Sequence, residues 1–358
     1  MRNVEIYAGP KARAHLREYG LRPQDIRVVP AAAGGPKGLV LNPLDRYIFG
    51  RWLAQSDQVV HVVGASIGAW RMACACLPDP GAALAQLAED YITQRYPHRP
   101  GKLPEAEVVS QIFGAKIVQR LGGALGQAVL SSPRYRLHVF TSHGRRLLHR
   151  PGRMRAAIGY LGAYLSNAAS RRALGIWLER VVFSDPRDEL PFPLADFRSQ
   201  RVALNEGNLA PAILASCTIP FALQAVQDVP GAPPGTYWDG GITDYHLHLN
   251  YSAMSEGLVL YPHFQPRIVP GWLDKAWHKR HRASGHLDNL VVLSPHPGFV
   301  ERLPNGKLPD RQDFRDLRDD DVGRERIWRV ALAESTRLAE DFARVVERGG
   351  PIDAQPLP

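Results

Sequence analysis

A serine lies between two glycines in the stretch Val62-Val63-Gly64-Ala65-Ser66-Ile67-Gly68, and this spacing can build a nucleophile. The Gly-x-Ser-x-Gly pattern needs a strand before it and a helix after it, with the serine on the sharp turn between them. Gly64 and Gly68 lack side chains that would collide with the neighbouring elements. The serine then faces unpaired N–H groups and the positive end of the helix dipole. A plain glycine-rich turn is the alternative, since Gly and Ser are common.

A second glycine-rich stretch precedes the serine, Gly34-Gly35-Pro36-Lys37-Gly38. It does not fit a phosphate-binding loop, because Leu39 stands where that pattern needs a hydroxyl residue. It fits an oxyanion hole better, with the Gly34 and Gly35 amides as the donors that stabilise negative charge in acyl transfer. Pro36 has no N–H to donate. An ordinary strand–helix turn is the alternative.

A third stretch, Thr236-Tyr237-Trp238-Asp239-Gly240-Gly241-Ile242, follows a turn rich in Pro and Gly. Aromatic residues that lead into an Asp with two glycines behind it are typical of a strand end that delivers a carboxylate into a tight space. The alternative is a common Asp-Gly turn.

The elements around these stretches predict how they are held. Apolar residues at 26–29 and 59–63 read as core strands, with a helical pattern at 39–49 between them. Strand, loop, helix and strand within about forty residues make a βαβ unit with parallel strands. Ser66 therefore follows the second of two parallel core strands.

The remaining pattern predicts both helices and strands. We expect a strand at 4–7 and helices at 10–19, 84–91, 108–121, 154–178, 207–216 and 322–347. Residues 135–141 and 145–149 read as a β-hairpin with a turn at 142–144, and 258–261 and 290–293 read as further strands. These elements predict a single domain over 1–358, with a motif-bearing core at about 26–242, a helical insertion at about 79–200 and C-terminal strands and a helix at 250–350.

The composition is that of a globular protein, with 358 residues, 45% hydrophobic and 22% charged. We see no apolar run near the roughly 20 residues of a membrane span, and no signal-peptide segment at Met1–Glu5. The three cysteines, Cys74, Cys76 and Cys217, do not form a disulfide framework. A reducing cytoplasm is the expected location.

The net charge is +9, with basic clusters at 145–146, 150–155, 171–172 and 275–282. A solvated surface explains them, and attraction to an anionic phospholipid membrane is the sharper interpretation. No nucleic-acid-binding signature accompanies the charge, so we expect no nucleic acid partner. Residues 270–282 mix Trp with Lys and Arg, which suits either a membrane-surface helix or a helix with its aromatics packed inward.

Taken together, the ordered stretches resemble the patatin-like phospholipase family. The family pattern is a Gly-rich loop that ends in Lys/Arg-Gly, then Gly-x-Ser-x-Gly, then a small-residue helix end closed by Pro, then Asp-Gly-Gly/Ala. Here these are Gly34 to Lys37-Gly38, Gly64 to Gly68, Ala215 to Pro220, and Asp239-Gly240-Gly241, over roughly 26–242. The resemblance implies a three-layer α/β/α fold with a mostly parallel central sheet, and hydrolysis of lipid acyl esters.

The resemblance also implies site roles. Ser66 would be the nucleophile and Asp239 its base, which together form a catalytic dyad, with Gly34 and Gly35 in the oxyanion hole and no cofactor. A buried carboxylate can act as the base if an apolar surround raises its pKa. The loop departs from the common Asp-Gly-Gly-Gly, since Ala32-Ala33 precede Gly34.

Three alternatives remain open on the sequence. One is a Ser-His-Asp hydrolase with His263 or His296 as the base. Another is a non-catalytic lipid-binding protein on the same fold, which the Ala32-Ala33 departure would suit. A third concerns a metal: His246 and His248 would point the same way on a strand, but no third ligand has a supporting spacing. We therefore expect no metal, and an ester of a lipid or another acyl compound as the substrate.

Overall fold

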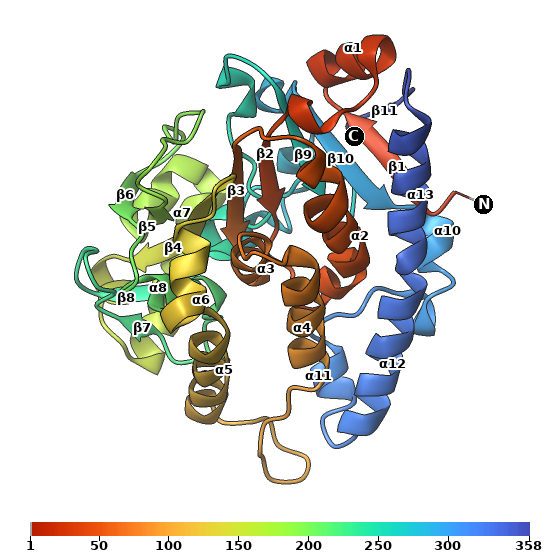
Figure 1. The fold of residues 1–358 in the computed structure, drawn as a ribbon. Coiled ribbons are helices and arrows are strands. Elements are labelled where there is room, and N and C mark those ends of the chain that lie inside the picture. The colour runs from red at the N-terminus through yellow and green to blue at the C-terminus, as the bar shows by residue number, and fades with distance from the viewer. Residues whose placement is uncertain (1) are drawn as a thin grey trace.

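The centre of the fold is a sheet whose middle strands are buried on both faces, as their apolar residues require. The computed structural model describes residues 2–358 (Figure 1). Within that range the strands are β1 (Val4–Ala8), β2 (Ile26–Ala31), β3 (Val60–Ala65), β4 (Tyr135–Gly144), β5 (Leu178–Ser184), β6 (Ser199–Ala203), β7 (Val226–Gln227), β8 (Thr236–Asp239), β9 (Leu258–Pro262), β10 (Leu290–Pro295) and β11 (Gln355–Pro356).

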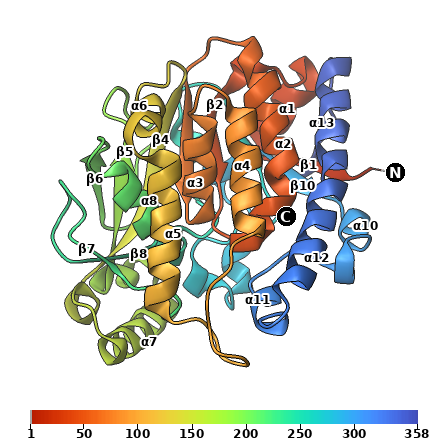
Figure 2. The same ribbon diagram turned by 60° about the horizontal axis from the view of Figure 1, so that its bottom comes forward.

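Helices flank this sheet and complete the expected three-layer α/β/α fold. Figure 2 shows α2, α3 and α4 side by side in front of the sheet. The helices of the described range are α1 (Pro10–Tyr19), α2 (Asn42–Tyr47), α3 (Ile67–Ala75), α4 (Pro80–Ile92), α5 (Ala106–Leu121), α6 (Gly123–Leu130), α7 (Arg153–Ala169), α8 (Leu209–Cys217), α9 (Gly241–Asp244), α10 (Pro297–Val300), α11 (Asp313–Asp316), α12 (Asp321–Glu334) and α13 (Thr336–Arg348).

The strand order is β11-β1-β10-β9-β2-β3-β4-β5-β6, with β8 paired to β4 and β7 paired to β8. The central run from β10 through β9, β2 and β3 to β4 is parallel. Antiparallel pairs occur where β1 joins β10 and where β4 joins β5 and β8. The expectation of a mostly parallel central sheet is confirmed.

One feature of the register brings the site together. Strand β3 runs parallel to β4 until Ala65 pairs with Phe140. Strand β8 runs antiparallel to β4 on the next residues, and its last residue, Asp239, pairs with Thr141. The two strands therefore approach each other head-on along β4, and their carboxyl ends meet. Ser66, which follows Ala65, must lie close to Asp239.

The expected hairpin at 135–149 is wrong. Strand β4 continues through the predicted turn to Gly144, and residues 146–149 form a 3-10 turn. Thr141 and Ser142 are fully buried and pair with β5 on one side and β8 on the other. Hydrogen bonds on both sides of the strand outweigh the local turn preference of Ser-His-Gly.

The helical insertion expected at 79–200 is also wrong in part, because this range contributes β4, β5 and the start of β6 to the sheet. The helix expected at 154–178 ends at Ala169, and Leu178 already begins β5. The single helix expected at 322–347 is two helices, α12 and α13, which meet at Ser335. Residues 270–282 contain two 3-10 turns, Trp272–Asp274 and His278–His281, where we expected a surface helix.

Candidate active site

Ser66 occupies a strained turn between β3 and α3. Its φ is 57° and its ψ is −134°, a left-handed conformation that few residues other than glycine adopt. The flanking glycines are required by close packing: a side chain at Gly64 would collide with the backbone of Ala69, and one at Gly68 with the carbonyl oxygen of Ala31. The strain is held by the packed surroundings, as is common for functional residues.

Ser66 and Asp239 are in direct contact. The Ser66 hydroxyl donates a hydrogen bond to Oδ2 of Asp239 over 2.7 Å. The other carboxylate oxygen, Oδ1, accepts from the Gly241 amide, also over 2.7 Å. Only 3% of Ser66 and 5% of Asp239 are exposed. The carboxylate is thereby fixed by one backbone donor and presents its second oxygen to the serine.

The surroundings make Asp239 a better base than an exposed Asp. Burial raises its pKa above the ordinary value, although the nearby Arg311, the Ser66 hydroxyl and the Gly241 amide each pull it down. The apolar residues expected around it, Tyr237, Trp238 and Ile242, are all buried. A carboxylate with a raised pKa holds a proton more readily when a serine hydroxyl gives it up.

Ser216 supports both halves of this pair, and the sequence did not single it out. Its hydroxyl accepts a hydrogen bond from the Ser66 amide over 2.8 Å and donates to the carbonyl of Phe140 on β4 over 2.6 Å. Its own carbonyl accepts from the Gly240 amide. The only sequence signal was its place in the small-residue helix end Ala215–Pro220. One buried serine thus ties the nucleophile turn, β4 and the Asp239 turn together.

The Gly-rich loop lies beside the serine. Strand β2 ends at Ala31, and the loop leads into a 3-10 helix at Gly35–Leu41. Gly35 has a φ of 57°, which favours glycine, and a side chain at Gly34 would come within 2.6 Å of the Phe264 ring. A side chain at Gly38 would come within 3.6 Å of Ile67, the residue after the nucleophile. The loop therefore packs against the start of α3.

The residues beside Asp239 are close-packed as well. Ala33, one of the two departures from the family loop, is buried, and a side chain on Gly241 would come within 2.5 Å of its methyl group. A side chain on Gly240 would collide with the carbonyl of Phe140. The two glycines after Asp239 therefore allow the Gly-rich loop and β4 to approach the carboxylate.

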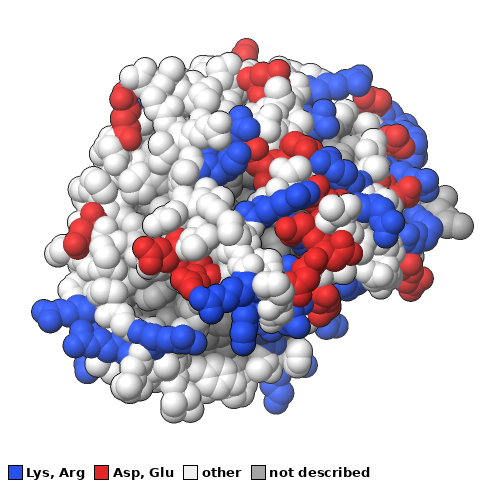
Figure 3. All heavy atoms as spheres, turned by 90° about the horizontal axis from the view of Figure 1, so that it is seen from below, with Lys and Arg blue, Asp and Glu red and all other residues white. Residues whose placement is uncertain are grey.

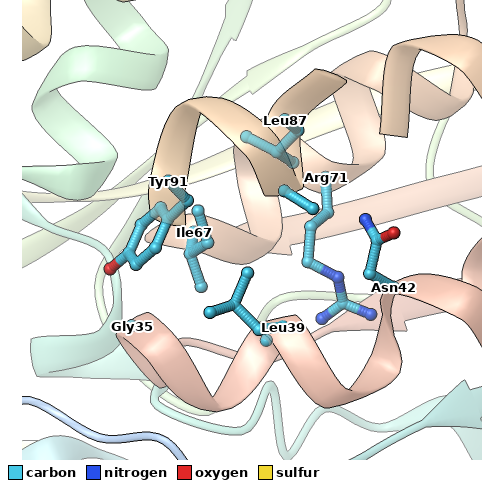
Figure 4. A pocket seen from close by; sticks show the side chains of 9 residues that line it. Gly35, Leu39, Asn42, Ile67, Arg71, Leu87 and Tyr91 are labelled. Carbon is cyan, nitrogen blue, oxygen red and sulfur yellow. The ribbon is translucent and has the colours of Figure 1, made fainter. Parts of the chain in front are cut away.

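A buried ion pair joins α2, which follows the Gly-rich loop, to α3, which follows Ser66. Arg71 on α3 donates two hydrogen bonds to Asp45 on α2, over 2.8 and 2.9 Å, and both side chains are buried. A small pocket lies beside this pair. In Figure 4, Leu39 and Ile67 face each other across it, with Arg71 at one end and Tyr91 at the other. The pair fixes how the loop and the nucleophile turn sit relative to each other.

Three cationic side chains lie near the dyad, on the side that we call its entrance. Arg311 lies 3.9 Å from Asp239, and Lys275 packs over the Tyr245 ring at 4.2 Å. Burial, with Arg311 and Lys37 nearby, lowers the pKa of Lys275 to about 8. Lys37, which the family pattern includes, lies over the Phe264 ring at 5.0 Å, and burial lowers its pKa too. No pattern in the sequence indicates that Lys275 and Arg311 lie here, since both follow Asp239 in loops.

The histidines named above lie elsewhere. His263 is buried and its Nδ1 contacts Gln265, while His296 accepts from Gly298 at the start of α10. Among residues 2–358, no histidine hydrogen-bonds to Ser66 or Asp239. His246 and His248 lie in the loop after α9 and not on a strand, so the condition for their side chains to point the same way is not met. Within that same range no group of three or more His, Cys, Asp or Glu side chains is arranged around a metal position.

In the described part of the chain, every helix is too short or too polar to cross a membrane.

A comparison with known protein families matches part of the chain to one family. A family model described as "Patatin-like phospholipase" matches residues 47–246, more than half of the chain. The matched range contains Ser66 and Asp239 but not the Gly-rich loop at 34–38. No curated protein matches. Among solved structures, the crystal structure of VipD from Legionella pneumophila is 12% identical, with a TM-score of 0.37, and the alignment covers 95% of this chain and 70% of that one. On the family match, the chain belongs to the patatin-like phospholipase family.

Proposed function

We propose that the protein is a serine acyl hydrolase that cleaves carboxylic ester bonds of lipids through a dyad of Ser66 and Asp239. The observation that carries this proposal is the 2.7 Å hydrogen bond from the Ser66 hydroxyl to a buried carboxylate whose pKa is raised. Family membership supports the reaction class, because the family is named for phospholipid hydrolysis.

The reaction follows from the geometry. Asp239 takes the proton as Ser66 Oγ attacks the ester carbonyl, and the oxyanion that forms is stabilised by N–H groups of the loop. Gly34 and Gly35 are our candidates for these donors. Asp239 then gives the proton to the leaving alkoxide as the tetrahedral intermediate collapses, which leaves an acyl group on Ser66. Water, deprotonated by Asp239, attacks the acyl-enzyme, and Asp239 returns the proton to Ser66 Oγ as the fatty acid is released.

Two observations favour this reading over the alternatives. A Ser-His-Asp triad needs a histidine within hydrogen-bond reach of the serine, and neither His263 nor His296 makes that bond. A non-catalytic protein would have no need for a strained nucleophile turn, yet Ser66 keeps a positive φ and a proton acceptor. The Ala32-Ala33 departure leaves Gly34 and Gly35 in place beside α3.

The cations at the entrance support a substrate with a negative charge near its ester. Within residues 2–358, Lys37 and Lys275 pack on aromatic rings and form no ion pair, and Arg311 reaches Asp239 only at 3.9 Å. A phosphodiester head group would offer these side chains the oxygen acceptors they lack. We therefore propose phospholipids over uncharged acylglycerols.

We further propose that residues 1–358 act as one catalytic unit, because β9, β10 and β1 extend the sheet that holds the dyad. The cysteines are free and buried, which suits the expected cytoplasmic location.

The test compares hydrolysis of a phospholipid and of a diacylglycerol with the same acyl chains in mixed micelles. Wild type should cleave both, and Ser66→Ala should cleave neither while keeping its fold by circular dichroism. Arg311→Gln should lower kcat/KM for the phospholipid at least about 10-fold more than for the diacylglycerol. Arg318→Gln is the matched control, since Arg318 has a similar side-chain exposure, 46% against 39%. Equal losses on both substrates would contradict the proposed role of Arg311, and full activity of Ser66→Ala would contradict the dyad.

A further inference from the structure

Helix α7 exposes large apolar side chains on its outer face. The exposed fractions are 78% for Met154, 53% for Ile158, 61% for Leu161 and 59% for Leu165. Isolated exposed hydrophobics are ordinary, but a row of them is not. We call these four residues the α7 stripe.

The stripe is a continuous line along the helix. At 100° per residue, its four side chains fall within about 60° of one another. The buried residues of α7, among them Ala156, Gly159 and Ala163, lie on the opposite side. Because the inner face already packs on Leu148, Leu174 and Leu178, the stripe adds nothing to the core. It extends over about 16 Å of helix.

The stripe lies close to the dyad. Tyr160, on the inner face of α7, packs edge-on against Trp238, the residue before Asp239, with ring centroids 5.8 Å apart. Phe221, which is 56% exposed, lies 6.2 Å from the same Tyr160 ring. The 3-10 turn at Trp272–Asp274, which precedes Lys275 of the entrance, also contacts α7. Apolar surface therefore continues from α7 toward the entrance.

The chain segment that contains the stripe has charged residues of one sign. Residues 108–178 contain eleven Lys and Arg and no Asp or Glu, whereas the rest of the chain holds 33 Lys and Arg against 35 Asp and Glu. This segment therefore carries more positive charge than the whole protein's net +9. Of the residues that the structure describes, none forms an ion pair with Arg146, Arg150, Arg153, Arg155 or Arg172, which lie at the two ends of α7.

The space-filling view agrees with this distribution. Figure 2 places α7 at the lower edge of this face. At that edge, Figure 3 shows uncharged surface with a row of basic side chains beside it. A hollow lies behind that row. Apolar side chains edged by arginines are the composition of helices that lie in a membrane interface, where arginines meet lipid phosphates and apolar groups enter the acyl region.

We propose that the α7 stripe and its flanking arginines dock the protein on an anionic lipid membrane, with the entrance to the dyad turned toward the bilayer. The purpose that we assign to this docking rests on the proposed lipid hydrolase function, whereas the membrane binding itself does not. A second copy of this chain is the less favoured occupant, because pairing two α7 helices would bring together two sets of the five arginines that form no ion pair within the described residues.

The experiment measures co-sedimentation with vesicles of phosphatidylcholine alone and with 30% phosphatidylglycerol, beside turnover of a soluble short-chain ester. Wild type should bind the anionic vesicles, and Ile158→Ser/Leu161→Ser should lower the partition coefficient at least about 10-fold. The control Val322→Ser/Val330→Ser removes two side chains of α12, which are 68% and 46% exposed, and should bind like wild type. Neither variant should change turnover of the soluble ester.

A second variant, Arg153→Gln/Arg155→Gln, tests the role of charge. It should weaken binding to anionic vesicles only, and 1 M salt should likewise weaken the binding of wild type to anionic vesicles. Unchanged vesicle binding by both α7 variants would overturn the proposal. Light scattering that shows a wild-type dimer, lost in Ile158→Ser/Leu161→Ser, would assign the stripe to a second copy and would also overturn it. Vesicle binding without any ester turnover would leave the docking surface standing and refute the hydrolase function.

Discussion

Replacing Asp239 by Asn separates proton transfer from every other contact of the site. Asn has nearly the same shape, and its one remaining oxygen can keep the hydrogen bond from the Gly241 amide. The amide nitrogen then faces Ser66, and it can donate a hydrogen bond but cannot take a proton. The variant therefore keeps the packing of the dyad and removes only its base.

The size of the effect follows from this geometry. Because no histidine of the described chain contacts Ser66, no second base can take over from Asp239. General-base catalysis contributes about 10²–10⁴-fold, so kcat/KM should fall at least that far. Stability should not fall with it. Burial raises the pKa of Asp239 in the folded chain, so its favourable contribution is present below the unfolded pKa and is lost as the pH rises through the folded pKa. At a pH above the folded pKa, the ionised carboxylate is a cost to stability that Asn removes.

The assay is kcat/KM on a soluble chromogenic ester, with Tm measured on the same samples. Wild-type kcat/KM should rise with pH in one step, above the ordinary Asp value of about 3.9 and without a histidine step. His263→Gln and His296→Gln serve as controls and should cost less than about 10-fold. The reasoning is refuted if Asp239→Asn keeps activity within about 10-fold of wild type while one folded histidine variant is inactive.

Three further predictions concern the support of the site. Arg71→Ala should lower the free energy of unfolding in urea by about 3–5 kcal/mol, because it leaves Asp45 buried without its partner; a loss below about 1 kcal/mol would contradict this. Ser216→Ala should lower kcat with little change in KM, since the Ser66 amide loses its acceptor; an unchanged kcat would remove Ser216 from the positioning of the turn. His61 hydrogen-bonds to His138, and burial lowers the pKa of His61 to about 4. The stability that His61 contributes to the fold is therefore complete above about pH 6.5, and it falls by on the order of 3 kcal/mol as the pH drops toward 4. Urea melts of wild type and His61→Phe across this range should converge at low pH, and parallel curves would refute the assignment.

The sequence could predict the dyad's local surroundings because each part has a short-range signal. An apolar strand, Gly-x-Ser-x-Gly and a small-residue helix lie within sixteen residues around Ser66, and the structure has β3 and α3 there. Asp239 was expected at a strand end, and it is the last residue of β8. What the sequence could not supply is the register that makes β3 and β8 meet along β4, since pairing partners far apart in the chain leave no local pattern.

The missed elements have the same cause. The sequence pattern does not predict strand β5, because Glu179 and Arg180 interrupt its apolar run. Arg180 is nevertheless fully buried between Asp196 and Asp244. A charged residue in a buried strand can be anticipated only when its partners are known. Arg311 likewise reaches the entrance from a loop 72 residues after Asp239, a placement that only tertiary packing determines.

The most direct test of the central claim is covalent labelling of the nucleophile. A fluorophosphonate probe should add once to the wild-type protein, and peptide mapping by mass spectrometry should place the adduct on Ser66, because its hydroxyl is the one hydrogen-bonded to Asp239. Ser66→Ala should not react, and Asp239→Asn should react at least about 100-fold more slowly. An adduct on another residue with Ser66 unmodified, or equal labelling of Ser66→Ala and wild type, would contradict the dyad.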